Sequence, residues 1–77
     1  MKEQITMRQR LADIQFIVNW AEMSEEYFSR TRHWIYQKMG GNIVNGKPAE
    51  FSEEEKQQLK NALYDVARRI TEAADKI

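Results

Sequence analysis

The sequence predicts a small all-α domain, and three observations support this prediction. Apolar residues recur at helical spacings of three and four in the first and last parts of the chain. No glycine or proline follows Pro48, so a last helix can run for many turns. The 77 residues are too few to give two halves a core each, so we expect one domain over residues 1–77. The expected fold is a four-helix domain with a central helix-turn-helix variant and a short Asn-Gly turn before a long C-terminal helix.

The first helix is predicted from about residue 2 to residue 19. Met7, Leu11, Ile14 and Val18 alternate at spacings of four and three, which places them on one helical face. The polar residues between them fall off this stripe, as expected for a helix that packs on one side.

Two short helices are predicted next, over about residues 21–28 and 32–39. The hydroxyl of Thr31 can cap the second helix by accepting from a free backbone N–H. Ile35 and Met39, four residues apart, would face the core. The two glycines that follow would end this helix, because glycine accepts the left-handed conformation that closes one.

A turn and a long helix complete the chain. Asn45-Gly46 is a strong two-residue turn signal and Pro48 forbids a long second strand, so we expect a tight loop or a ribbon of two-residue strands. Ser52 and Glu55 have the spacing of a capping box, and the helix that they begin should run to about Asp75. The apolar positions of this helix are Leu59, Leu63, Val66, Ile70, Ala73 and Ile77.

The apolar residues of these helices divide into a predicted core and a surplus. The predicted core consists of Leu11, Ile14, Val18, Phe28, Ile35, Leu59, Leu63 and Val66. The residues that exceed the needs of one small core are Phe16, Trp20, Ile70, Ala74 and Ile77. Because the surplus lies on the first and last helices, we predict a homodimer formed through them.

Composition argues against several classes of function. The chain has no cysteine and one histidine, His33, and no serine stands in a nucleophile motif. It has no glycine-rich phosphate-binding motif. No unbroken apolar run is longer than the three residues of Phe16–Val18, far short of a membrane span. We therefore expect a cytoplasmic, non-enzymatic protein with no metal, no cofactor, no small-molecule substrate and no membrane partner.

A net charge of zero conceals an uneven distribution. Residues 27–49 carry four bases and no acid, whereas residues 21–26 and 50–56 each carry a net charge of −3. The four bases are Arg30, Arg32, Lys38 and Lys47. Two explanations are open: the helix dipole favours acids at helix starts and bases near helix ends, or the basic stretch faces a nucleic acid.

The basic stretch coincides with the two short helices, which have the dimensions of a helix-turn-helix. Arg32 and Gln37 have side chains that can form paired hydrogen bonds with guanine and adenine edges, and His33 and Tyr36 would lie beside them. The candidate phosphate contacts are Arg30, Thr31, Lys38 and Lys47. The expected partner is therefore double-stranded DNA, and the expected function is that of a small transcriptional regulator of a mobile element.

A protein-interaction module is the alternative from a different class. The polar face of the second short helix could simply face water, and the isoelectric point of about 6.6 is not that of a generally basic protein. On this alternative the domain keeps a helix-turn-helix-like scaffold and binds a protein, not DNA.

Residues 24–41 resemble the helix-turn-helix of Cro/phage-repressor-type regulators. Ser29 stands where that family has its turn glycine, and Thr31-Arg32 matches the Ser/Thr-Arg entry to its recognition helix. The family's small residue four positions before the turn corresponds to Glu25. Ser24 takes that place only if the first helix or the turn holds one extra residue.

A second resemblance covers residues from about 19 to 70. Short Bacteroides-type proteins, catalogued as a domain of unknown function, share a Tyr-Phe…Ser/Thr-Arg-x-Trp-[Leu/Ile]-Tyr-Gln run that is found here within residues 27–41. That run is followed by Asn-x-Val-Asn-Gly-Lys-Pro-Ala, here residues 42–49. The resemblance implies a shared fold and no particular activity.

Two interpretations of residues 42–49 remain open. Asn-Gly and proline can shape a turn that lets the last helix fold back. Alternatively Asn42, Asn45 and Lys47 contact phosphates or the minor groove, as a wing does.

Overall fold

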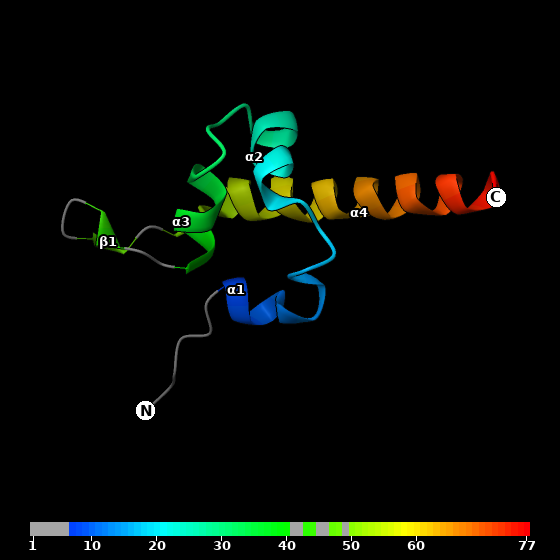
Figure 1. The fold of residues 1–77 in the computed structure, drawn as a ribbon. Helices are drawn as coiled ribbons and strands as arrows, with labels where there is room; N and C mark the ends of the chain where they lie inside the picture. Colours follow the sequence, from blue (N-terminus) through cyan, green and yellow to red (C-terminus); the bar gives the residue numbers. More distant parts are fainter. Residues whose placement is uncertain (1–6, 41–42, 45–46, 49) are drawn as a thin grey trace.

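The computed structural model describes residues 7–40, 43–44, 47–48 and 50–77, and this part of the chain is mainly helical. Its α-helices are α1 (Met7–Arg10), α2 (Trp20–Phe28), α3 (Trp34–Gly40) and α4 (Glu53–Asp75), with a 3-10 turn η1 (Ala12–Ile14) after α1. Figure 1 shows α2 and α3 beside the first half of α4, whose C-terminal half extends past them. The predicted all-α class with four helices is confirmed for the described residues.

The start and end of α4 follow the local sequence. Ser52 Oγ accepts a hydrogen bond from the backbone N–H of Glu55 at 3.1 Å, and the Glu55 carboxylate accepts one from the N–H of Ser52 at 2.8 Å. This is the predicted capping box, which satisfies two N–H groups at the helix start. The helix ends at Asp75, so it is about 35 Å long at 1.5 Å per residue.

A two-stranded ribbon precedes α4. Strands β1 (Ile43–Val44) and β2 (Lys47–Pro48) are antiparallel, with Ile43 opposite Pro48 and Val44 opposite Lys47. The expected ribbon of two-residue strands is confirmed. Its turn residues, Asn45 and Gly46, lie outside the described residues.

The prediction of one continuous helix over residues 2–19 is wrong where the structure describes the chain. Here α1 ends after one turn, and further turns follow η1 before α2 begins. Asn19 caps α2, because its Oδ1 accepts from the N–H of Glu22 at 3.1 Å. The indole N–H of Trp20 also donates to the carbonyl of Gln15 at 2.9 Å. Continuing the helix through Asn19 would remove both contacts, so the chain turns instead.

The connection between α2 and α3 is longer than predicted. Helix α3 begins at Trp34, so Arg32 and His33 precede it instead of forming its first turn. Thr31 contributes its carbonyl oxygen, which accepts from the hydroxyl of Ser24 at 2.6 Å and from the N–H of Trp34 at 3.1 Å. The N–H of Gln37 donates to the carbonyl of His33 at 3.2 Å, so helical hydrogen bonding reaches back to His33.

The core lies between α2, α3 and the first half of α4. Its buried apolar residues are Trp20, Met23, Phe28, Ile35, Met39, Phe51, Leu59 and Ala62. The predicted core positions Phe28, Ile35 and Leu59 are confirmed. The other predicted positions, Leu11, Ile14, Val18, Leu63 and Val66, are half-buried around this cluster. Trp20, predicted at a subunit contact, is 3% exposed and belongs to the core, because the Asn19 cap turns the chain there.

Candidate functional site

The chain reverses between α2 and α3 at a residue in the left-handed region. Ser29 has φ 55°, and its N–H donates to the carbonyl of Ser24. The N–H of Arg30 donates to the same carbonyl at 3.0 Å. Ser24 is fully buried, and its hydroxyl bond to Thr31 fixes the connection against α2. A small residue is therefore required at this place, because the turn passes directly over it.

An aromatic cluster fixes α3 against its neighbours. The Trp34 ring lies 4.9 Å from that of Phe28 on α2 and 5.9 Å, edge to face, from that of Phe51 before α4. The guanidinium of Arg30 and the ammonium of Lys38 lie 5.4 and 5.7 Å from the centre of the Trp34 ring. These distances are typical of aromatic and cation–π contacts, so the connection and α3 have a defined position.

The ammonium group of Lys38 contacts other residues of the chain. Its Nζ donates to the carbonyl of Glu50 at 2.9 Å and lies 3.3 Å from a carboxylate oxygen of Glu55. Burial alone would raise the pKa of Glu55, but the N–H of Ser52 and the charge of Lys38 outweigh burial and lower it. Lys38 therefore joins α3 to the capping box of α4, and only 24% of its side chain is exposed.

Arg32 is held by two acids of α2. Its Nη1 lies 3.2 Å from Glu22 and 3.0 Å from Glu25, and all three side chains are about half exposed. The hydrogen bond to Glu22 and the charge of Glu25 raise the pKa of Arg32. The predicted guanine reader is therefore paired in this structure with carboxylates from the acidic stretch before it.

Three of the remaining predicted residues form an exposed surface on α3 and on the residue before it. His33, Tyr36 and Gln37 are spaced by three and one, so they share the helix face opposite Ile35 and Met39, and all three are exposed. We call His33, Tyr36 and Gln37, together with the exposed Arg30 before them, the α3 surface. Lys47 lies on β2, and its side chain, like the whole of Asn42 and Asn45, is outside the described residues.

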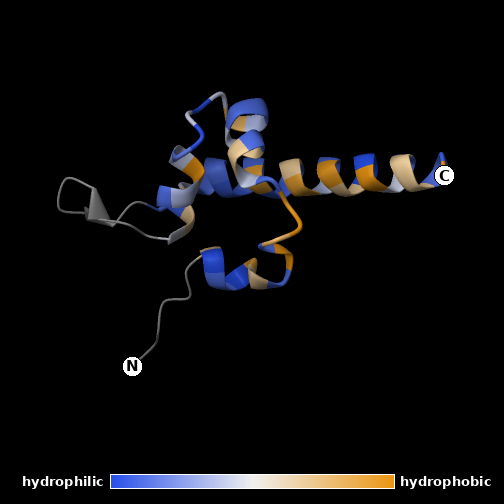
Figure 2. Cartoon of the chain, viewed as in Figure 1, coloured by the Kyte–Doolittle hydropathy of each residue, from blue (hydrophilic) through white to orange (hydrophobic). Residues whose placement is uncertain are grey.

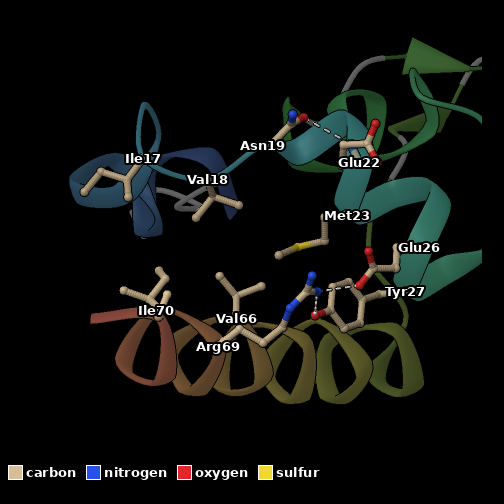
Figure 3. Close-up of a pocket in the computed structure, with 11 residues that line it drawn as sticks. Ile17, Val18, Asn19, Glu22, Met23, Glu26, Tyr27, Val66, Arg69 and Ile70 are labelled. Carbon is tan, nitrogen blue, oxygen red and sulfur yellow. Dashed lines mark hydrogen bonds and ion pairs between the residues drawn. The ribbon is translucent and has the colours of Figure 1, made fainter. Parts of the chain in front are cut away.

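A groove that the sequence prediction missed lies between the start of α2 and the C-terminal half of α4. It has a volume of about 530 Å³. Figure 3 shows Ile17 and Val18 on one side and Val66 and Ile70 on the other, with Met23 between them. The surplus of apolar residues, which includes Ile70, is the only feature of the sequence that indicates this groove. The position of residues 17–18 opposite α4 depends on the turn before α2, which the apolar spacing does not predict.

A polar network closes one end of this groove. The Tyr27 hydroxyl donates to Asp65 at 2.6 Å, and Arg69 donates to the same hydroxyl at 2.9 Å and to Glu26 at 2.6 Å. The hydrogen bond to Asp65, together with burial, raises the pKa of the Tyr27 hydroxyl. The hydrogen bonds that Asp65 accepts from Tyr27 and Arg68 lower the pKa of its carboxyl group. The network joins α2 to α4.

The described residues contain neither a metal-binding group nor a membrane-spanning helix. No three His, Cys, Asp or Glu side chains in this part of the chain gather in a group that could hold a metal ion. None of its helices is long and apolar enough to cross a membrane.

Comparison with known proteins identifies a family. No curated protein and no solved structure matches the chain significantly. A family model described as a domain of unknown function, DUF5053, matches residues 7–77. The match begins at α1 and includes every described element, together with the runs at residues 27–41 and 42–49. The chain therefore belongs to the DUF5053 family.

Proposed function

We propose that this chain binds double-stranded DNA through the α3 surface, as a small, non-enzymatic transcriptional regulator of a mobile element. The observation that carries the proposal is the arrangement of α3. Ile35 and Met39 are buried, and the exposed residues of α3, Tyr36 and Gln37, have hydrogen-bonding side chains. No acid occurs from residue 27 to residue 49 that would repel phosphate at this surface.

The dimensions and chemistry of the α3 surface suit the major groove. An α-helix with its side chains is about 10–12 Å across, and the major groove is about 12 Å wide. The amide of Gln37 can pair with adenine, while His33 and Tyr36 can donate to bases or phosphates. Arg30, held over the Trp34 ring, is the phosphate contact that we assign.

The connection supports a variant of the helix-turn-helix. Residues 29–33 separate the two helices, one or two more than the usual turn of three or four. Ser24 is small and fully buried beneath the connection, and it lies five positions before Ser29, one more than in the resembling family. Ser29 adopts the positive φ for which the resembling family uses glycine.

Arg32 takes part in the proposed DNA contact only after its ion pairs with α2 are broken. It can contact DNA only by leaving Glu22 and Glu25, and the polyanion would have to replace both carboxylates. The double variant Glu22→Gln/Glu25→Gln should therefore tighten DNA binding more than Glu53→Gln/Glu54→Gln, which removes the same charge from the start of α4. Equal effects of the two double variants would remove Arg32 from the interface.

The test begins with selection from random duplex DNA, followed by titration of the selected and an unrelated duplex at two salt concentrations. Gln37→Ala should cost about 1–3 kcal/mol on the selected site and relax preference at one position. Arg30→Ala should weaken both duplexes alike and lower the salt slope by about one. Lys60→Ala, the same change of charge on an exposed position of α4, is the control. A wild-type chain that binds neither duplex at low salt rules out the proposal.

The second candidate function is a protein-interaction module that uses the same α3 surface. The pairing of Arg32 and Lys38 with glutamates favours it, because two of the four bases in the basic stretch are neutralised within the chain. The same titrations separate the two functions, since a protein-interaction module should show no salt-dependent binding to either duplex.

A further inference from the structure

The groove beside α4 and the exposed C-terminal part of the same helix both present apolar surface to solvent. The groove is walled by Ile17 and Val18 on one side and by Val66 and Ile70 on the other. Ile17 is 71% exposed and Ile70 is 55% exposed, so two large apolar side chains face water across an open space. Proteins seldom leave such neighbouring apolar surface uncovered.

Exposure rises steadily along the apolar stripe of α4. Leu59 is buried, Val66 is half-buried, and every residue from 67 to 77 is exposed. The stripe nevertheless continues at helical spacing through Ile70 and Ala73 to Ile77, and Figure 2 shows apolar residues in this part of the helix. The last three turns thus present an apolar face that nothing in the described chain covers.

We infer that a second copy of this chain covers both surfaces, with the end of α4 from each copy seated in the groove of the other. Groove and stripe share Val66, Ile70 and Ala73, so one two-fold rotation brings each stripe to the partner's groove at the same time. The small side chains of Ala73 and Ala74 allow a second helix to approach closely. This inference does not depend on DNA binding.

A dimer would bury apolar side chains that each copy leaves exposed. A stable interface buries roughly 800 Å² on each partner. Large apolar side chains would contribute to that area, because Ile17, Ile70 and Ile77 are each more than half exposed. A different partner would have to bring its own apolar helix, whereas the second copy already has one.

The experiment measures the mass of the full chain by sedimentation over a range of concentrations. Wild type should change from 9.2 kDa to twice that mass as its concentration rises. Ile70→Glu should weaken self-association at least tenfold, because it places a charge in the groove and in the stripe together. Tyr64→Glu is the matched control: Tyr64 is a 65% exposed residue of α4 outside the groove, and its variant should associate like wild type.

Cross-linking provides a second measurement should Ile70→Glu fail to fold. The chain has no cysteine, so single-cysteine variants report one contact each. Under mild oxidation, Ile17→Cys mixed with Ala74→Cys should form a disulfide-linked dimer in higher yield than Ile17→Cys mixed with Tyr64→Cys. A chain that stays at 9.2 kDa at high micromolar concentration overturns the inference, as do equal association of both glutamate variants or equal cross-linking of both mixtures.

Discussion

Leu59 and Leu63 lie one turn apart on the same stripe of α4, but their surroundings differ. Leu59 is 2% exposed within the core cluster, whereas Leu63 is half-buried at its edge. Truncating a fully buried leucine to alanine costs about 2–5 kcal/mol, and we expect Leu59→Ala to fall in that range. Leu63→Ala should cost about half as much, since part of its side chain already contacts water and less apolar area is lost.

These losses are large for a domain of this size. At about 0.05–0.15 kcal/mol per residue, the free energy of unfolding of 77 residues is on the order of 4–12 kcal/mol. Urea unfolding, followed by far-ultraviolet circular dichroism at low protein concentration, measures each variant against wild type. Equal losses at the two positions, or a loss below about 0.5 kcal/mol for Leu59→Ala, would refute the assignment of the buried face of α4.

The remaining predictions concern the helix ends. Ser52→Ala should lower the free energy of unfolding by about 1 kcal/mol because it removes the cap, and a change near zero in urea would contradict the capping box. Ser29→Gly should raise it by up to about 1 kcal/mol because glycine adopts φ 55° without a Cβ clash, and any loss would argue against the positive φ. The pKa of Glu55 is lower in the folded chain than its ordinary value of about 4.3. Its contribution to the free energy of unfolding is therefore present above about pH 4.3 and is lost as the pH falls through the folded pKa. Unfolding at pH 7 and pH 3 should therefore show a smaller acid loss in Glu55→Gln than in wild type, and identical losses would exclude this role.

Local signals explain which parts of the fold could be predicted. The capping box needs only Ser52 and Glu55, three residues apart, and the end of α4 needs only an unbroken helical pattern. The ribbon before α4 similarly follows from one Asn-Gly pair and one proline. Ile35 and Met39 are correctly placed in the core because their spacing alone puts them on one side of a short helix.

Contacts across the fold explain what could not be predicted. The apolar spacing of the first nineteen residues fits a helix, but the Asn19 cap and the bond from Trp20 to the Gln15 carbonyl favour a turn. Moving Trp20 into the core then changes which apolar residues remain outside it. Phe51 was not recognised as core because its burial depends on two rings from α2 and α3, which no spacing along the chain reveals.

Which basic residues are paired with acids also depends on contacts across the fold. Counting along the chain separates an acidic stretch from the basic stretch after it, as if the two faced different partners. In space Arg32 turns back to Glu22 and Glu25, and Lys38 reaches Glu55, so half of the basic residues are matched by acids from the flanking stretches. Exposed ion pairs are weak, at about 0–1 kcal/mol each, and a polyanion can compete for such bases. The local charge beside the α3 surface therefore depends on whether Arg32 stays with its carboxylates, and replacing those carboxylates tests whether Arg32 contributes to DNA binding.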